Sequence, residues 1–311
     1  MKKVLITGAG GFIGSNMVEF LLKNTDFFIY GIDNYINGKE NEDFVKELIS
    51  NRFEFIENDF TNFDFSNKEI DVVYHFAAIP SVPYSVDFPV ETDLNNINKT
   101  VKLLKLCSDH KVKKFIFSSS SSVYGDPLEV PTGESNYELP KTPYAIQKLT
   151  IEKYCRIWSE LYNLYTISLR YFNVYGPNQY SNNAYASVIC NWVKNILLNN
   201  KIRIDGDGKQ KRCFTYVEDI CRANLFFSLK EDNYIKPINI STNTSINLLD
   251  IKDKLIGILN KNPSIIWSEK RKGDIEISEA KTTFSESIGF KTIWDIDEGL
   301  KQTINWYKNK L

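Results

Sequence analysis

The fold is decided by residues 3 to 14, which read Lys-Val-Leu-Ile-Thr-Gly-Ala-Gly-Gly-Phe-Ile-Gly. The first five residues are a short run rich in branched apolar side chains and closed by glycine, which is typical of a buried parallel strand. A helix is expected from about residue 12. The glycines at positions 8, 11 and 14 would permit a tight turn, close approach of a pyrophosphate to the backbone, and close packing of that helix. This pattern predicts a dinucleotide site lined by Gly8, Gly11, Phe12, Ile13 and Gly14.

The same alternation of strand and helix continues along the chain. Further strands are predicted at 27–33, 53–58, 72–77, 114–119 and 165–169, with helical stretches between most of them. Strands that alternate with helices indicate a doubly wound parallel sheet, that is, a Rossmann-type α/β fold. Beyond Asn173 the pattern is looser and favours a smaller α/β lobe. We therefore expect a dinucleotide-binding domain over 1–172, rejoined by a strand near 238–240, and a lobe that is mainly substrate-binding over 173–311.

Composition excludes several classes of function. The chain has 311 residues, and its 38 basic and 39 acidic side chains give a formal net charge of −1, which does not favour a polyanionic partner such as nucleic acid. The five cysteines form no CxxC pair, so neither a disulfide framework nor a metal site is expected. No apolar run approaches the length of a membrane-spanning helix, and the first apolar run is too short for a signal peptide. We expect a cytoplasmic protein that contacts no membrane.

An acidic residue specifies the dinucleotide. Asp33 ends the second predicted strand, 19 residues after Gly14. A carboxylate at this position can accept hydrogen bonds from an adenosine ribose, and it would repel the 2′-phosphate of NADP. The sequence therefore predicts NAD as the cofactor, with Asp33 and the adjacent Asn34 at the ribose.

Two polar groups suggest redox chemistry on a hydroxyl. Ser118 to Ser122 end the strand predicted at 114–119, at the edge where open α/β sheets bind ligands. Tyr144 and Lys148 lie four residues apart, so in a helix they share a face, and the ammonium group would lower the pKa of the phenol. Such a tyrosine can act as a general base while a hydride leaves the adjacent carbon.

Three longer motifs carry a family resemblance. Phe-Ser-Ser-Ser-Ser-Ser-Val-Tyr-Gly (117–125), Pro-Tyr-Ala-Ile-Gln-Lys (143–148) and Leu-Arg-Tyr-Phe-Asn-Val-Tyr-Gly-Pro (169–177) resemble the extended short-chain dehydrogenases that epimerise or dehydrate nucleotide sugars. The resemblance covers essentially the whole chain and is greatest to UDP-N-acetylglucosamine 4-epimerases. It implies that Ser120 is the catalytic serine, Tyr144 the base, and Lys148 its partner, which also holds the nicotinamide ribose.

The resemblance also implies the remaining cofactor contacts. Asp59 and Phe60 would lie by the adenine, and the stretch after His75 would lie by the pyrophosphate and nicotinamide ribose. His75 itself is expected to be a hydrogen-bonded residue at a strand end with no direct role in the chemistry. The other cofactor contacts implied are Phe76, Ala77, Ala78, Asn95, Asn96, Tyr144 and Tyr171.

A nucleotide-sugar site is implied by the same resemblance. Arg212 and Arg271 would clamp the diphosphate, a task for which the planar guanidinium is suited. Ser278 falls where a bulky residue would exclude an N-acetyl group at the sugar C2, so its small side chain predicts acceptance of N-acetylated sugars. The other substrate contacts implied are Ser81, Val82, Ser121, Ser122, Asn173, Val188, Arg203 and Asp274.

Three residues depart from the family pattern. Lys99 stands where glycine is usual, Cys213 stands where aspartate is usual after Arg212, and Arg203 lies near the nucleobase where an aromatic residue is common. Arginine can stack on uracil or on guanine, so the base could be either.

The expected activity is 4-epimerisation of a UDP-hexose or UDP-N-acetylhexosamine through a transient 4-keto sugar, in a homodimer. The 4,6-dehydratases carry Thr-Asp-Glu where this chain has serines, which disfavours dehydration. The alternatives are a nucleotide-sugar 4-dehydrogenase or 4-ketoreductase, a UDP-uronic acid 4-epimerase, and an NAD-binding regulatory protein.

Overall fold

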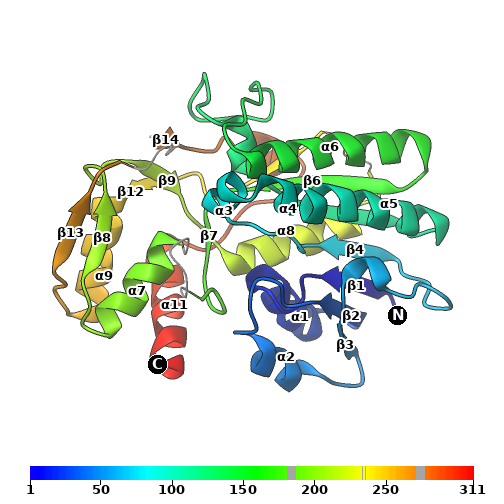
Figure 1. Cartoon of the computed structure of the whole chain (residues 1–311), viewed down its shortest axis with the longest axis horizontal. Helices are drawn as coiled ribbons and strands as arrows, with labels where there is room; N and C mark the ends of the chain where they lie inside the picture. Colours follow the sequence, from blue (N-terminus) through cyan, green and yellow to red (C-terminus); the bar gives the residue numbers. More distant parts are fainter. Residues whose placement is uncertain (181–186, 233, 235, 271–276) are drawn as a thin grey trace.

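The computed structural model describes residues 1–180, 187–232, 234, 236–270 and 277–311. Figure 1 shows a larger part built on a twisted sheet and a smaller part that contains β8, β13, α7, α9 and α11. The chain crosses between the two parts more than once, because α8 returns to the larger part after β9 and β10. Within the described residues, no helix is long and apolar enough to cross a membrane.

Seven parallel strands form the central sheet, in the order β11-β6-β5-β4-β1-β2-β3. Their bounds are β1 Lys3–Thr7, β2 Phe28–Asp33, β3 Phe53–Glu57, β4 Val72–His75, β5 Lys114–Ser120, β6 Tyr165–Tyr171 and β11 Ile238–Ile240. The predicted Rossmann-type fold is therefore confirmed. The strand near 238–240 pairs with β6 at the edge of this sheet, whereas the division of the chain at residue 172 stays a prediction.

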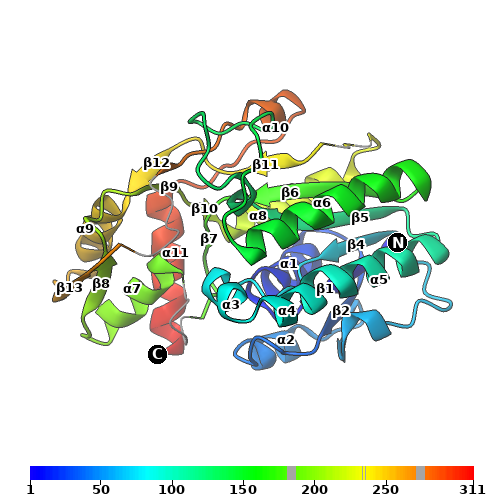
Figure 2. The ribbon, with the colours of Figure 1, turned by 45° about the horizontal axis from the view of Figure 1, so that its top comes forward.

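Helices cover both faces of the sheet, so each face has its own apolar core. On one face α1 packs against α8, and Val4 and Ile6 of β1 point into that core. On the other face α5 and α6 lie side by side (Figure 2), and Leu5 points toward them. This alternation along β1 is what a strand buried on both faces requires. The helices of this part are α1 Phe12–Asn24, α2 Glu42–Leu48, α3 Val82–Asp87, α4 Pro89–Asp93, α5 Lys99–Asp109, α6 Pro143–Leu161 and α8 Val217–Leu229.

The smaller part is made of short strands and three longer helices around a third core. Its elements are β7 Val174–Tyr175, α7 Val188–Leu197, β8 Ile202–Asp205, β9 Lys211–Cys213, β10 Thr215–Tyr216, β12 Ser245–Asn247, α9 Leu248–Leu259, β13 Ile265–Ser268, β14 Ile277–Ser278 and α11 Ile296–Lys310, whereas α10 Thr283–Ser287 packs against β11 of the central sheet. Trp192 of α7 is fully buried in this core, together with residues of α9 and α11. The strands pair in two small sheets, β12-β9-β14 and β13-β8, and each sheet brings segments far apart in sequence side by side.

Candidate active site

The glycine-rich turn between β1 and α1 is closed so tightly that side chains are excluded. A Cβ atom at Gly14 would lie 2.0 Å from the carbonyl oxygen of Gly8, and one at Gly8 would lie 2.7 Å from the amide nitrogen of Ala77. Gly8 also has a φ of +73°, which favours glycine. No side chain caps the start of α1. The backbone N–H groups of its first turn are therefore available to an anion such as a pyrophosphate.

Asp33 lies beside this turn at the end of β2. One carboxylate oxygen accepts a hydrogen bond from the amide of Gly10 (2.9 Å) and the other accepts one from the amide of Tyr35 (2.7 Å). Burial raises the pKa of Asp33, and these backbone hydrogen bonds act in the opposite direction. A carboxylate can accept several hydrogen bonds, so Asp33 could also accept one from a ribose hydroxyl.

Lys99 forms an ion pair inside the predicted adenine site. Its Nζ lies 2.6 Å from Asp59 Oδ2 and 3.1 Å from Asn95 Oδ1. The side-chain Nδ2 of Asn34 lies 3.5 Å from Asp59 Oδ2 as well. Burial alone would raise the pKa of Asp59, but the hydrogen bonds from Lys99 and Thr61 hold it below its usual value. The departure at position 99 thus places a cation among three residues predicted to contact the cofactor.

Hydrogen bonds from buried polar residues hold the loop after β4 in place. His75 is buried and forms hydrogen bonds with Thr7 (2.6 Å) and Thr100 (2.8 Å), and burial lowers its pKa to about 3. This confirms its reading as a hydrogen-bonded strand-end residue. Asn96 accepts from the amide of Ile79 and donates to the carbonyl of Ile79 and to Gln147. Its amide therefore supports the loop that contains Phe76, Ala77 and Ala78.

Ser120, Tyr144 and Lys148 are brought together from two elements, the end of β5 and the first two turns of α6. Lys148 is 3% exposed; its Nζ donates to the carbonyl oxygen of Ser118 (2.7 Å) and lies 5.7 Å from the centroid of the Tyr144 ring. Thr142 caps the start of α6, and the amide of Tyr144 donates to Ser85 Oγ (3.0 Å). Ser85 is a buried residue of α3. It ends the stretch 78–85, which resembles the family's substrate loops, but sequence reasoning assigned it no role of its own.

The structure does not show the lowered pKa that the helical spacing predicted for Tyr144. Burial raises the pKa of Tyr144 to about 12, and a hydrogen bond with Ser120 acts in the opposite direction. Burial also lowers the pKa of Lys148 to about 7, against the effect of the Glu152 carboxylate. The Lys148 ammonium group donates to the Ser118 carbonyl oxygen, and Lys148 is not among the groups that lower the pKa of Tyr144.

Comparisons with known proteins place this geometry in a family. Residues 4–241 match the NAD dependent epimerase/dehydratase family. The chain belongs to this family. A solved UDP-N-acetylglucosamine 4-epimerase from Methanobrevibacter ruminantium M1, in complex with UDP-N-acetylmuramic acid, is similar with a TM-score of 0.92 and 36% identity over 100% of this chain and 99% of that one. A UDP-glucuronic acid 4-epimerase from Bacillus cereus, in complex with UDP-glucuronic acid and NAD, has a TM-score of 0.90 and 32% identity over 99% and 100% of the chains.

A curated relative gives the same result from sequence. The UDP-glucuronate 4-epimerase of Thermodesulfobacterium geofontis (strain OPF15) is 33% identical over an alignment of 329 positions, which covers 100% of this chain and 98% of the relative. As an epimerase/dehydratase family enzyme, this chain uses NAD. When bound, NAD supplies a hydride acceptor and the positive charge of its nicotinamide ring. The glycine turn, with no room for a Cβ at Gly8 or Gly14, fits this cofactor, and Asp33 is the residue that would hold its ribose.

The predicted substrate residues of this family enzyme lie on several separate elements. Ser278 of β14 is paired in register with Arg212 of β9, so the predicted sugar-selecting residue lies beside a predicted phosphate clamp. Arg203 lies on β8 in another sheet, where its Nε is 2.6 Å from Asp205 Oδ1. Two predicted residues, Arg271 and Asp274, fall outside the described residues.

The other predicted substrate residues occupy helix starts and a strand end. Ser81 caps α3, and Val82 is the first residue of that helix. Ser121 and Ser122 begin a short 3₁₀ helix after β5, where Ser122 Oγ is buried without a hydrogen-bond partner among the described residues. Asn173 donates to the carbonyl oxygen of Cys213 (2.8 Å). Val188 begins α7, and the predicted cofactor residues Phe60 and Tyr171 are both buried.

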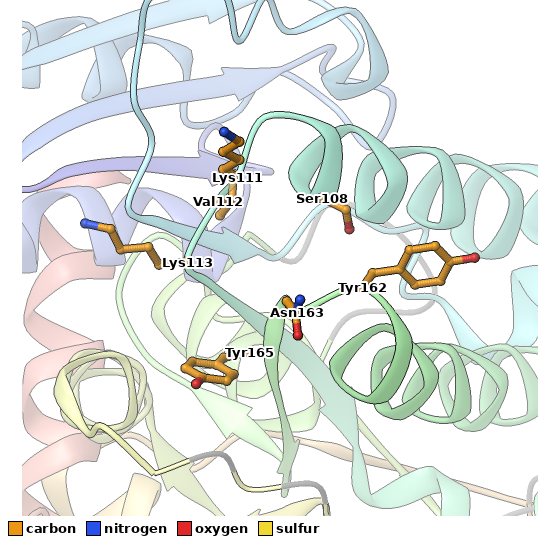
Figure 3. A pocket seen from close by; sticks show the side chains of 7 residues that line it. All are labelled: Ser108, Lys111, Val112, Lys113, Tyr162, Asn163 and Tyr165. Atoms are coloured by element: carbon orange, nitrogen blue, oxygen red, sulfur yellow. The ribbon is translucent and has the colours of Figure 1, made fainter.

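A cavity of about 480 Å³ opens at the opposite edge of the sheet, at the amino ends of β5 and β6 (Figure 3). Its lining residues are Ser108, Lys111, Val112, Lys113, Tyr162, Asn163 and Tyr165. None of these belongs to the predicted site. Parallel α/β sheets bind ligands at the carboxyl ends of their strands, so this cavity is separate from the active site.

Proposed function

We propose that this enzyme is a UDP-hexose 4-epimerase that accepts UDP-N-acetylglucosamine and UDP-N-acetylgalactosamine. In this mechanism Ser120 hydrogen-bonds the 4-hydroxyl oxygen of the sugar, and Tyr144 removes its proton as the C4 hydride leaves. The 4-keto sugar turns over in the site, and the same groups then act in reverse on its other face. Lys148 holds the nicotinamide ribose.

One observation carries the choice of epimerase. Ser120, Tyr144 and Lys148 lie together at the carboxyl edge of the sheet, and the chain from 118 to 125 carries no acid that could eliminate water. Asp126, the next carboxylate, forms an ion pair with Lys141. This supports oxidation and reduction at C4 without dehydration.

The sugar is proposed from the pairing of β14 with β9. Ser278 is small and lies in register with Arg212, so a bound diphosphate at Arg212 would bring the sugar close to Ser278. A serine leaves space for an acetamide at C2. The uracil base, the clamps at Arg212 and Arg271, and the role of Arg203 are parts of the same proposal.

The test is conversion without added cofactor. We expect purified protein incubated with UDP-N-acetylglucosamine to form UDP-N-acetylgalactosamine, measured by separating the two isomers chromatographically. If no isomer forms even when NAD is supplied, the epimerase proposal is rejected. In a parallel incubation with UDP-glucuronate, formation of its 4-epimer and of no other isomer would support the uronic acid alternative. Net accumulation of a keto sugar together with NADH would support the dehydrogenase.

We further propose a cytoplasmic homodimer joined through α4, α5 and α6. Exposed apolar side chains gather on the segment 86–94 and on α6; they are Val86, Phe88, Val90, Leu94, Ile146, Tyr154 and Leu161. All five cysteines are buried and unpaired, which agrees with a reducing compartment. Light scattering of the protein as it elutes from a size-exclusion column should give twice the mass of one chain. In the Val90→Glu variant the measured mass should fall to that of one chain.

A further inference from the structure

Three turns of α6 contact the last three residues of β5. Tyr144, Lys148 and Glu152 are four residues apart and share one face of the helix. This face meets residues 118–120, which include the proposed catalytic serine. Lys148 donates to the carbonyl oxygen of the first of these residues (2.7 Å), and the Ser119 hydroxyl donates to Glu152 Oε1 (2.5 Å).

Glu152 is itself fixed by a buried arginine from the neighbouring strand. Arg170 Nε lies 2.9 Å from Glu152 Oε1, and Arg170 Nη2 lies 2.6 Å from Glu152 Oε2. A two-point contact of this kind sets the orientation of the carboxylate as well as its position. Arg170 is paired in register with Ser119, so the three side chains tie α6, β5 and β6 together at one level.

These groups are removed from solvent. Glu152 is 4% exposed and Arg170 is 0% exposed, and Glu138 accepts a further hydrogen bond from the same guanidinium (2.8 Å). Burying an ion pair is costly, and well-packed apolar residues often serve stability equally well. The hydrogen bond that Glu152 accepts from Ser119 indicates a different role, which is to fix the geometry at the end of β5.

We propose that Glu152 is a positioning residue for the reaction. By holding Ser119 it fixes the end of β5, and so sets the distance between the Ser120 hydroxyl and the Tyr144 phenol. It also fixes the carbonyl group that orients Lys148. The inference rests on the proposed function, because that function gives these three residues their roles.

The decisive variant is Ser119→Ala, which removes the tether and leaves the Glu152–Arg170 ion pair in place. We expect kcat for epimerisation to fall on the order of tenfold, since small misplacements of reacting groups are costly, while KM changes less than about twofold. Ser119→Thr, which restores the hydroxyl, should recover most of the loss. A purely structural role would lower thermal stability without this split between kcat and KM.

A matched control is Ser228→Ala. The Ser228 hydroxyl is also buried, accepts from Tyr74 (2.7 Å) and donates to the carbonyl of Leu225 (2.8 Å), but it lies on α8, away from β5's end. We expect a similar decrease in melting temperature and an unchanged kcat. If Ser119→Ala and Ser228→Ala have the same kcat, the positioning role is rejected.

Glu152→Gln tests the coupling, because glutamine preserves the size of the side chain and removes its charge. If both residues act through one contact, the double variant with Ser119→Ala should lose no more than about twofold beyond the larger single loss. Losses that multiply would contradict the proposal.

Cofactor binding separates this inference from the proposed function. Titration of NADH, followed by its fluorescence, needs no sugar substrate. We expect Ser119→Ala to weaken NADH binding about threefold, as for one weakened hydrogen bond near Lys148, and Ser228→Ala to leave it unchanged. A wild-type protein that converts no UDP sugar would reject the function alone, whereas equal NADH affinity in the wild type and Ser119→Ala would reject the inference.

Discussion

The cofactor side and the sugar side of the site are constructed in different ways. On the cofactor side, Gly8 and Gly14 are packed against backbone, and Lys148 is hydrogen-bonded inside the protein. On the sugar side, Ser278 and Arg212 lie on strands of two and three residues, and the Arg203 side chain is 58% exposed. The proposed chemistry thus depends on parts that tolerate little change, whereas the proposed choice of substrate depends on side chains that can be exchanged without rebuilding the fold.

The largest effect is expected at the base. Tyr144→Phe removes the phenolic oxygen, so the 4-hydroxyl proton has no acceptor, and kcat should fall on the order of a thousandfold. The ring remains, and NAD should stay bound. Isomer formation and the NAD content of the purified variant are the two measurements.

Two outcomes of the Tyr144→Phe experiment would contradict the assignment of Tyr144 as the base. Normal turnover by Tyr144→Phe would show that another group accepts the proton. Loss of NAD from the variant would mean that Tyr144 serves the cofactor and not the proton transfer alone. Tyr84→Phe is a suitable control, because the Tyr84 hydroxyl is bonded to Glu91 and lies on exposed surface.

A methyl group at position 14 tests how rigid the cofactor side is. In Gly14→Ala the new Cβ would meet the Gly8 carbonyl oxygen at 2.0 Å, so α1 must move away from the turn. We expect the affinity of the variant for NAD to fall on the order of a hundredfold, because the backbone amides that would bind the pyrophosphate are displaced. Isothermal titration of the NAD-free protein measures this.

Gly257→Ala is the matched control for that variant. Gly257 lies on α9, and a Cβ there would meet no atom within 4 Å. Alanine in a helix is favoured over glycine by about 0.5–1 kcal/mol, so the melting temperature should rise slightly with unchanged NAD affinity. Equal NAD affinity in the two variants would contradict the rigid-turn argument.

On the sugar side, a larger residue should change the substrate and preserve the chemistry. In Ser278→Tyr, the ring would occupy the space proposed for the acetamide, so kcat/KM for UDP-N-acetylglucosamine should fall about a hundredfold. The rate with UDP-glucose should stay within about threefold, because this sugar has no acetamide for the tyrosine ring to exclude. Competition between the two substrates measures the ratio. An equal fall with both would mean that Ser278 does not select the C2 substituent.

The difference between the two sides also explains what sequence could predict. The glycine spacing at 8, 11 and 14, and the order of strands and helices, are local patterns with direct geometric meaning, and they predicted the sheet and the cofactor turn. The pKa of Tyr144 was predicted wrongly, because the i,i+4 spacing does not reveal burial or the carbonyl that takes the Lys148 ammonium group. Ser85 and the Glu152–Arg170 pair are contacts between distant segments, and no local pattern specifies them.

Lys99 is an exception on the cofactor side. It lies in the predicted cofactor site, but its side chain departs from the family pattern and can be exchanged. Its ion pair with Asp59 is partly exposed and contributes up to about 1 kcal/mol. Glycine within a helix costs roughly a further 0.5–1 kcal/mol, so Lys99→Gly on α5 should cost about 1–2 kcal/mol of stability. Without the ammonium group, Asp59 and Asn95 lose a shared partner, and NAD affinity should weaken by about threefold or less. Titration of NAD measures this, with Lys105→Ala, at the surface pair with Asp109, as the control. A loss above about thirtyfold would show that Lys99 belongs with the rigid part of the site and holds the cofactor directly.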